Sequence, residues 1–296
     1  MIITHTIDST NHSFNQGDTR CIDCQQQTFN RLLKKFHTTP EQQVEFSKAF
    51  KRITSSAKRG TMVDIHRELN RVFCKISGVS DPFQAEKRES NLAALSLYDE
   101  MEKTVEKSEN PFQTALKICI AGNIMDYGVN NEFNIRSTIN HALKNNFAIN
   151  HSLYLQERLN NASKVLYLGD NAGEIVFDKL FIKTLNRTDV TFVTRGNNVL
   201  NDATEKDAEQ TGLHEIVNVI NNGYDAPSTI INKCGTTFLQ HYKESDVIIA
   251  KGQGNFEGLI TEKNPKIFYL MVIKCNVIAE MLCKKKGDYV VYNPFV

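Results

Sequence analysis

Hydrophobic and polar positions follow one pattern in the first half of the chain. Between Cys21 and Leu159, apolar residues recur at intervals of three and four, as in Phe29, Leu32, Leu33 and Phe36. This spacing places them on one face of a helix, so it predicts a series of amphipathic helices. Prolines mark several predicted helix starts, at Thr39-Pro40, Ser80-Asp81-Pro82 and Asn110-Pro111.

The pattern changes after Ser163, where short β-rich runs alternate with helical segments. The predicted strands are Val165–Leu168, Val190–Thr194, Ile216–Ile220, Val247–Ala250, Ile267–Leu270 and Tyr289–Tyr292. The predicted helices between them include Ala172–Leu185, Ser228–Tyr242 and Val277–Lys284. This alternation is typical of parallel strands joined by right-handed crossovers. We therefore expect an α/β protein, with a helical region over 1–160 and a Rossmann-like, doubly wound, mainly parallel sheet over 161–296.

The composition of the chain indicates which binding partners its charge does not favour. The 296 residues include 35 Lys and Arg against 34 Asp and Glu, a balance that favours neither nucleic acid nor an anionic membrane as partner. No apolar run approaches the roughly 20 residues of a membrane helix. The polar N-terminus lacks the apolar core of a signal peptide, and seven Cys fit reduced thiols better than a disulfide framework. We expect a cytoplasmic protein.

Polar segments follow four of the predicted strands. Asp170 and Asn171 come directly after the first, and Asp202 lies in the segment after the second. The Gly-rich run Lys251–Glu257 follows the fourth strand, and Lys274 follows the fifth. Because parallel strands end at one edge of a sheet, these groups should meet there.

Their chemistry is that of a metal bridging to a phosphate. Carboxylate and carboxamide oxygens suit a hard divalent cation such as Mg²⁺ or Mn²⁺. Asp170 and Asn171 offer such oxygens, and Lys251 and Lys274 are placed to offset charge on a phosphoryl group. Structural alternatives remain open, since Asp170-Asn171 is also suited to an Asx turn and helix N-cap, and Asp202 with Glu205 resembles a capping box.

Other motifs are absent or incomplete. No Gly-x-Gly-x-x-Gly follows the first strand, and the sequence has neither a phosphate-binding P-loop nor a nucleophile elbow. Cys21 and Cys24 form one Cys-x-x-Cys pair, which is half of a zinc site, and no second pair follows at finger spacing. We expect a structural role for this pair.

The helical region also offers polar residues to the site. Asn123 and Asp126 are three residues apart, so on a helix they share a face. We expect this face to cover the carboxyl edge of the sheet and to contact substrate. A polar face exposed to solvent is the alternative.

Several motifs together resemble the damage-control phosphatases, long known as domain of unknown function eighty-nine. They are Gly169–Glu174, Arg195–Thr204, Lys251–Glu257, Ala121–Gly128, Ile273–Ile278 and the Cys-x-x-Cys pair. The eukaryotic signature Arg-Thr-x-Lys reads Met271-Val-Ile-Lys274 here, so the chain is more similar to the Cys-x-x-Cys-bearing, largely prokaryotic branch.

The resemblance implies a metal-dependent phosphatase of small phosphometabolites, such as sugar phosphates or damaged metabolites. It implies metal ligation by Asp170, Asn171 and Asp202, with Mn²⁺, Mg²⁺ or another first-row ion. The loop that contacts phosphate and substrate in the family matches Lys251–Glu257. We assign Glu174 and Asn255 to substrate binding on this basis. A Rossmann-like ligand-binding protein or a carboxyl methyltransferase is the alternative function.

Overall fold

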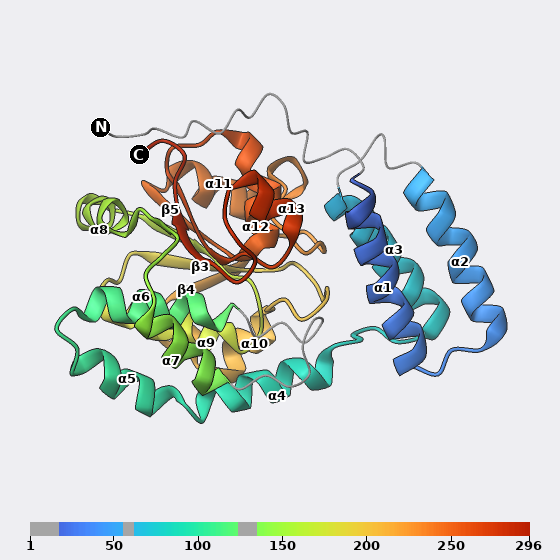
Figure 1. Ribbon diagram of the computed structural model, residues 1–296, viewed down its shortest axis with the longest axis horizontal. Helices are drawn as coiled ribbons and strands as arrows, with labels where there is room; N and C mark the ends of the chain where they lie inside the picture. Colours follow the sequence, from blue (N-terminus) through green and yellow to red (C-terminus); the bar gives the residue numbers. More distant parts are fainter. Residues whose placement is uncertain (1–17, 56–61, 124–134) are drawn as a thin grey trace.

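The computed structural model describes residues 18–55, 62–123 and 135–296, which form a mixed α/β fold on a seven-stranded sheet (Figure 1). The strand order is β1-β7-β6-β5-β2-β3-β4. Neighbouring strands are parallel except β6 and β7, which are antiparallel. The strands are β1 (Ile149–Asn150), β2 (Val165–Leu168), β3 (Val190–Thr194), β4 (Asn218–Asn221), β5 (Val247–Lys251), β6 (Ile267–Val272) and β7 (Tyr289–Tyr292).

The helices precede the sheet and connect its strands. Those before β1 are α1 (Thr19–Lys35), α2 (Pro40–Ser55), α3 (Met62–Ser77), α4 (Gln84–Leu95), α5 (Tyr98–Glu106), α6 (Pro111–Gly122) and α7 (Ile135–Lys144). The later ones are α8 (Ser152–Asn161), α9 (Glu174–Leu185), α10 (Glu205–Gln210), α11 (Thr236–Glu244), α12 (Gly252–Leu259) and α13 (Asn276–Met281). The expected starts at Pro40 and Pro111 are confirmed, and the Asn110 side chain caps α6 by accepting from Gln113 N.

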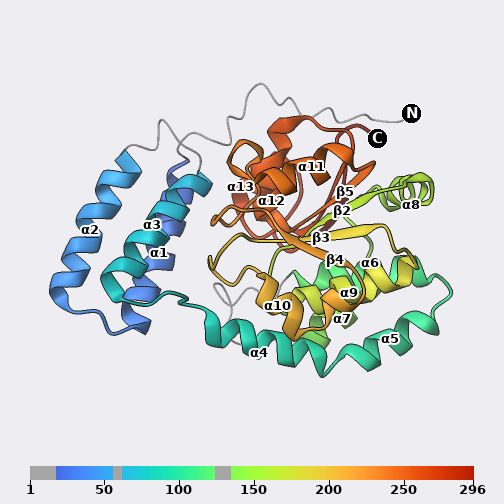
Figure 2. The ribbon, with the colours of Figure 1, turned by 180° about the vertical axis from the view of Figure 1, so that it is seen from behind.

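The central strands are buried on both faces, which explains their continuous apolar sequence. Val165 and Tyr167 of β2 belong to a core shared with α6 and α9, whereas Leu166 and Leu168 face a second core. That second core includes Phe238 of α11, Phe256 of α12 and Ile278 of α13. The view from behind shows helices on both sides of the sheet (Figure 2). The expected doubly wound, mainly parallel sheet is therefore confirmed.

Some bounds differ by a few residues from the sequence-based prediction, and three differences have an identifiable cause. β1 lies in the region expected to be helical, because its two residues are too few to produce a periodic pattern. β4 begins at Asn218 instead of Ile216, after a 3₁₀ turn over Leu213–Glu215. The helix predicted over Ser228–Tyr242 begins only at Thr236.

Hydrogen bonds to α12 explain the late start of α11. Ser228 Oγ donates to the Gly254 carbonyl at 2.7 Å, and Thr229 Oγ1 donates to Asn255 Oδ1 at 2.9 Å. These bonds hold both residues in a buried loop, and a short 3₁₀ turn over Ile231–Lys233 follows. Tertiary contacts thus override the local helical pattern.

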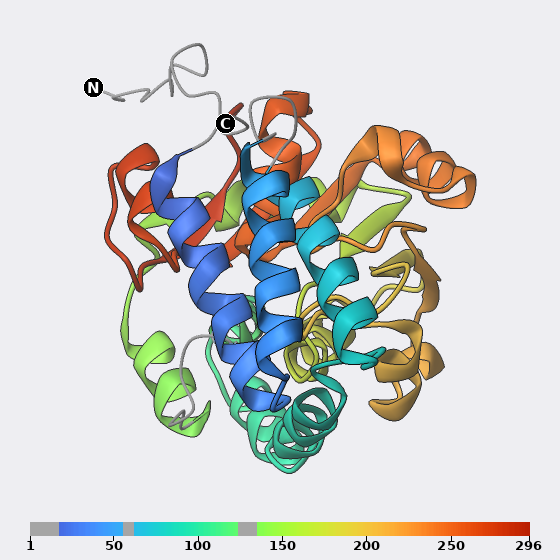
Figure 3. The same ribbon diagram turned by 90° about the vertical axis from the view of Figure 1, so that its right-hand side faces the viewer.

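Helices α1, α2 and α3 share an apolar core of their own and stand side by side (Figure 3). Leu200, in the loop after β3, packs against this core, and Val63 of α3 packs against Tyr224 in the loop after β4. The Arg67 guanidinium lies 4.8 Å from the Tyr224 ring centroid. Arg20 of α1 pairs with Glu280 of α13 at 2.8 Å. The three helices therefore cover the carboxyl edge of the sheet.

The predicted division of the chain near residue 160 stays a prediction. Ala115 and Ile118 of α6 share one apolar core with Phe177 of α9, so helices from both regions pack together. Across the described ranges, helices fall short of the length and apolarity needed to cross a membrane.

Candidate active site

The candidate site lies at the carboxyl ends of β2, β3 and β5. From β2 the chain proceeds to β3 and β4 on one side and then returns to β5 on the other side of β2. Such a reversal of strand order opens a crevice beyond the strand ends, where α/β proteins bind ligands. Asp170 and Asn171 follow β2, and Lys251 ends β5 at this reversal.

Two carboxylates and two carboxamides form the centre of the site. Asn123 Nδ2 donates to Asp170 Oδ2 at 2.9 Å and to the two Glu174 oxygens at 3.1 and 2.9 Å. Asn171 Nδ2 donates to Asp170 Oδ2 and to Glu174 Oε2, both at 2.9 Å. Asn123 and Glu174 are 0% exposed, Asn171 3% and Asp170 6%. The structure thus brings these four predicted residues together.

Arg195, directly after β3, connects the remaining groups. Its Nε donates to Asp202 Oδ2 at 2.6 Å, and its Nη2 donates to Asp170 Oδ1 at 3.2 Å. Its Nη1 donates to Asn255 Oδ1 at 2.9 Å and to Thr229 Oγ1 at 3.3 Å. The guanidinium is buried, so these contacts fix Asp170, Asp202 and Asn255 relative to one another.

The loops after β2 and β3 are also joined through their backbones. Ala203 N donates to the Asp170 carbonyl at 2.7 Å, and Ala172 N donates to the Asn201 carbonyl at 2.9 Å. Asn171 and Asp202 consequently face each other in an isolated antiparallel bridge. Two residues 31 positions apart in the sequence are therefore direct neighbours.

Neither the Asp170-Asn171 pair nor Asp202 caps a helix, so the helix-capping alternatives are wrong. Helix α9 is capped by Gly173, which has a positive φ of 77° and contributes no side-chain hydrogen bond. The capping box of α10 is formed by Thr204 and Asp207, not by Asp202 and Glu205. Asp170 and Asp202 instead direct their carboxylates toward Arg195.

Lys251 lies beneath Glu174 and is 0% exposed. Its Nζ is 2.7 Å from Glu174 Oε1, pairs with Asp178 Oδ1, and donates to the Cys119 carbonyl at 3.1 Å. Three acceptors use all three N–H groups of the ammonium. The prediction that Lys251 contacts a phosphoryl group stays a prediction.

Burial and charge act in opposite directions on the pKa values of these groups. Burial, together with Glu174, raises the pKa of Asp170, against the lowering effect of Lys274 and Arg195. Burial also raises the pKa of Glu174, but Lys251, Lys274 and the hydrogen bond from Asn123 together outweigh burial, so the net pKa is lowered. The pKa of Asp178 rises to about 6, mainly through burial. Burial lowers the pKa of Lys251, yet Asp178 and Glu174 raise it well above its ordinary value.

Negative charge exceeds positive charge among the buried side chains. Asp170, Glu174, Asp178 and Asp202 are four carboxylates, whereas Arg195 and Lys251 are the basic groups paired with them and the half-buried Lys274 adds a third positive charge nearby. Uncompensated buried charge is costly, so the excess favours a bound cation.

The donor set fits a hard divalent ion. Asp170, Asn171 and Asp202 supply two carboxylates and a carboxamide, the oxygen ligands that Mg²⁺ and Mn²⁺ prefer. Because Asn171 Nδ2 faces two carboxylates, its Oδ1 is turned away from them. Throughout residues 18–55, 62–123 and 135–296, no three His, Cys, Asp or Glu side chains converge closely enough to hold a metal by themselves. The Asn171 oxygen, water and substrate would have to complete the shell.

The remaining predicted residues are placed as follows. Lys274 is half-buried and near enough to lower the pKa of Asp170 and Glu174 by its charge. Asn255 Nδ2 donates to the Gly169 and Lys251 carbonyls at 3.1 and 2.8 Å. Asp126 lies outside the described residues.

Sequence reasoning missed Arg195, Asp178 and Thr229 as members of the site. Asp178 is four residues after Glu174 on α9, so two acids share one face of a mostly apolar helix. That spacing could have indicated from the sequence that Asp178 lies near Glu174 in the site. Arg195 stood inside a motif, but nothing local indicated that its guanidinium would lie between Asp170 and Asp202.

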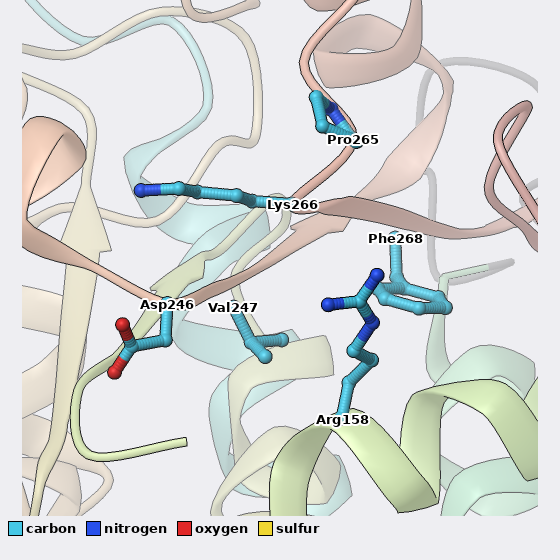
Figure 4. A pocket seen from close by; sticks show the side chains of 6 residues that line it. All are labelled: Arg158, Asp246, Val247, Pro265, Lys266 and Phe268. Carbon is cyan, nitrogen blue, oxygen red and sulfur yellow. The ribbon is translucent and has the colours of Figure 1, made fainter. Parts of the chain in front are cut away.

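A small cavity of about 50 Å³ lies away from this site, at the amino ends of β5 and β6 (Figure 4). Asp246, Val247, Pro265 and Phe268 line it with Arg158 and Lys266. Asp246 accepts hydrogen bonds from Ser163 N and Lys164 N, which ties it to the preceding turn. The cavity contains none of the predicted site residues.

Cys21 and Cys24 both lie on α1, one turn apart. Cys21 is half-buried and packs beside the three-helix core, whereas Cys24 is exposed. Burial, with added repulsion from nearby Glu257, raises the pKa of the Cys21 thiol to about 12. A neutral thiol is a poor nucleophile and metal ligand, so a structural role stays the prediction.

Comparisons with known proteins place these residues in a family context. A family model described as "Damage-control phosphatase ARMT1-like domain" matches residues 18–290. An uncharacterized protein of Methanocaldococcus jannaschii is 37% identical over 243 residues, covering 78% of this chain and 77% of that protein. A damage-control phosphatase of Archaeoglobus fulgidus is 34% identical over 76% of this chain and 79% of its own.

A solved structure is also similar. The crystal structure of a DUF89 family protein from Pyrococcus horikoshii matches with a TM-score of 0.85 and 26% identity. The match covers 94% of this chain and 99% of that one. The similarity therefore extends over nearly the whole fold, including the three helices at the carboxyl edge.

Proposed function

Because the chain belongs to the damage-control phosphatase ARMT1-like family, we propose that it is a metal-dependent phosphatase that hydrolyses small phosphomonoesters. The observation that carries the metal dependence is the excess of carboxylates over basic side chains in a fully buried cluster. The relatives named as damage-control phosphatases support the phosphatase activity.

Asp170, Asn171 and Asp202 would hold the cation. A bound divalent ion supplies electrostatic stabilisation to phosphoryl oxygens and acidifies a water molecule. The protein keeps these ligands in place through Arg195, which contacts both Asp170 and Asp202, and through Glu174, which accepts from the Asn171 amide. Rigid placement matters because small displacements of catalytic groups reduce rates strongly.

Phosphate recognition would come from Lys274 and the loop after β5. Lys274 is half-buried at the site, so part of its surface is accessible to a ligand. Its backbone N donates to Gln253 Oε1 at 3.0 Å, which connects it to the start of α12. We prefer Lys274 to Lys251 for this role, because the three N–H groups of Lys251 already have protein acceptors.

Sugar phosphates and damaged phosphometabolites are the substrate class that we propose. Asn123 and Asn255 are fully buried and bonded to protein groups in this structure, so their substrate contacts stay predictions, as does that of Asp126, which lies outside the described residues. The carboxyl methyltransferase alternative has no specific observation in its favour.

Phosphate release tests the proposal. Purified protein is incubated with p-nitrophenyl phosphate and a panel of sugar phosphates, with Mn²⁺, with Mg²⁺, or with EDTA. We expect metal-dependent release that falls by a factor of about 100 or more in Asp170→Ala, since losing a metal ligand removes several kcal/mol of transition-state stabilisation.

Glu262→Ala provides the matched control. It removes an exposed carboxylate on the 3₁₀ turn Ile260–Glu262 and should keep the wild-type rate. Release that is equal with EDTA and with Mn²⁺ would refute the metal dependence. Absence of release from every phosphomonoester, with methyl transfer to a carboxyl acceptor instead, would favour the alternative function.

A further inference from the structure

A chain of buried polar contacts extends from the site into the core behind it. Glu174 contacts Lys251, Lys251 contacts Asp178, and Asp178 Oδ1 accepts from Tyr167 OH at 2.7 Å. All four side chains are 0% exposed. We propose that Asp178, supported by Tyr167, is a positioning residue: it fixes Lys251 against Glu174 and so orients the Asn171 carboxamide for metal binding.

The first step concerns the ammonium of Lys251. A buried ammonium requires counter-charge and acceptors for its three N–H groups. Glu174 supplies one acceptor, but its two oxygens also accept from Asn123 and Asn171. Asp178 supplies the second carboxylate, and the Cys119 carbonyl completes the set at 3.1 Å. Without Asp178, Lys251 would have one carboxylate, already shared with two amides.

The second step concerns the carboxamides. An ionised carboxylate only accepts hydrogen bonds, so Glu174 selects the amide nitrogens of Asn123 and Asn171 and turns their oxygens away. For Asn171, the oxygen turned away is the proposed metal ligand. Displacing Lys251 would weaken the hold on Glu174 and allow the Asn171 amide to rotate.

The cost of Asp178 argues that it serves more than packing. Its Oδ2 is buried, and the described residues offer it no hydrogen-bond partner. Burying an unpartnered carboxylate oxygen is unfavourable, whereas apolar residues fill equivalent positions elsewhere on α9, such as Phe181 and Ile182. A carboxylate buried at such a cost is suited to holding a charge in place.

The inference rests on the proposed function for its metal, so the experiment measures binding separately from turnover. Mn²⁺ affinity is measured by titration calorimetry for wild type, Asp178→Asn and Tyr167→Phe, at a temperature where each variant is folded. We expect Asp178→Asn to bind Mn²⁺ about 10 to 100 times more weakly, the usual effect of losing an outer-shell partner. Tyr167→Phe should shift affinity in the same direction but less, because it removes the hydrogen bond to Asp178 and the contact with Cys119 Sγ but leaves the charge of Asp178.

Ile182→Ala is the matched control. Ile182 is one turn after Asp178 on α9 and buried in the apolar core, so its truncation destabilises the fold without touching the polar chain. Even if Ile182→Ala lowers Tm as much as Asp178→Asn does, it should bind Mn²⁺ with wild-type affinity. In the double variant Asp178→Asn with Lys251→Met, affinity should match that of Lys251→Met alone, because both changes act through one contact.

Side-chain amide signals of Asn123 and Asn171 in ¹⁵N–¹H spectra add a readout that needs no metal. They should shift in Asp178→Asn and stay in place in Ile182→Ala. Wild-type affinity and unshifted amide signals in Asp178→Asn would overturn the proposal. If Asp178→Asn does not fold, the same readouts on Tyr167→Phe decide.

The failures of the two proposals are distinguishable. Wild-type protein that binds Mn²⁺ but releases no phosphate refutes the phosphatase, while weaker binding by Asp178→Asn still supports the positioning role. If wild-type protein binds no metal, the metal dependence fails and the amide signals test Asp178 directly.

Discussion

Gly252 lies so close to Asp170 that a Cβ atom at position 252 would be 1.9 Å from Asp170 Oδ2. Gly252 also has a φ of +77°, which other residues rarely adopt. The turn between β5 and α12 is therefore pressed against the carboxylate after β2, at the point where the strand order reverses. Glycine at this position is a condition for the candidate metal ligand to keep its place.

The first prediction follows from that contact. Gly252→Ala should lower the free energy of unfolding by about 2–4 kcal/mol, through the clash and the left-handed backbone, and should abolish Mn²⁺ binding because Asp170 is displaced. Denaturant unfolding measures the first effect and calorimetry the second.

Gly78→Ala is the control. Gly78 has a similar φ of +73°, but a Cβ atom there would have no heavy atom within 4 Å. This variant should therefore lose only about 1 kcal/mol of unfolding free energy and should keep metal binding. Equal behaviour of the two variants would show that the contact with Asp170 is unimportant.

A second prediction concerns Arg195. Arg195→Lys keeps the charge, but one ammonium cannot replace a guanidinium that contacts Asp170, Asp202 and Asn255 through different nitrogens. We expect a loss of about 3 kcal/mol in unfolding free energy, in the range for disrupted buried ion pairs. Mn²⁺ should recover part of the lost Tm by binding the released carboxylates. Lys164→Arg, at an exposed pair with Glu244, should change neither quantity. A fully stable Arg195→Lys would contradict the bridging role.

The third prediction is a pH dependence of stability that originates in the three-helix core. His66 is buried against Phe29, and burial lowers its pKa from 6.5 to about 4. The unfolded chain therefore takes up a proton as pH falls below about 6.5, while the folded protein does not until about pH 4. Stability should consequently fall between pH 6.5 and 4, by about 2–3 kcal/mol from this residue.

His66→Gln removes the titrating group and should flatten the stability profile over that window. His37→Gln is the control, because His37 is exposed just after the end of α1 and lies outside this core. Urea unfolding at pH 4.5, 5.5 and 7 provides the comparison. A slope that is unchanged in His66→Gln would assign the pH dependence to other groups.

The fourth prediction concerns the cysteines of α1. Cys21→Ser combined with Cys24→Ser should lower stability by about 1 kcal/mol, because a hydroxyl replaces the half-buried thiol of Cys21, and phosphatase activity per folded molecule should stay near wild type. Elemental analysis of wild-type protein should find no stoichiometric zinc. Loss of activity in a double variant that is fully folded and binds Mn²⁺ normally would place the thiols in the mechanism.

Local sequence was sufficient for most of the elements and for the polar groups at one edge of the sheet. The apolar runs of β2, β3 and β7 were predicted with the bounds that they have, since strands buried on both faces must be continuously apolar. Once the strands are inferred to be parallel, their carboxyl ends must lie along the same edge of the sheet. Asp170, Asn171, Asp202 and the run Lys251–Glu257 were consequently predicted at one site from their positions after strands, whereas the roles of Glu174 and Asn255 came from the family resemblance.

Only the tertiary structure decided which charges face each other. Lys251 and Asp178 are 73 residues apart, and Arg195 reaches Asn255 across 60, so no local pattern encodes either contact. The short strand β1 and the delayed start of α11 also depend on partners distant in sequence, β7 and α12. The physical reason is that periodicity determines which face of an element is apolar, whereas the partner of a buried charge depends on which elements the packed core brings together.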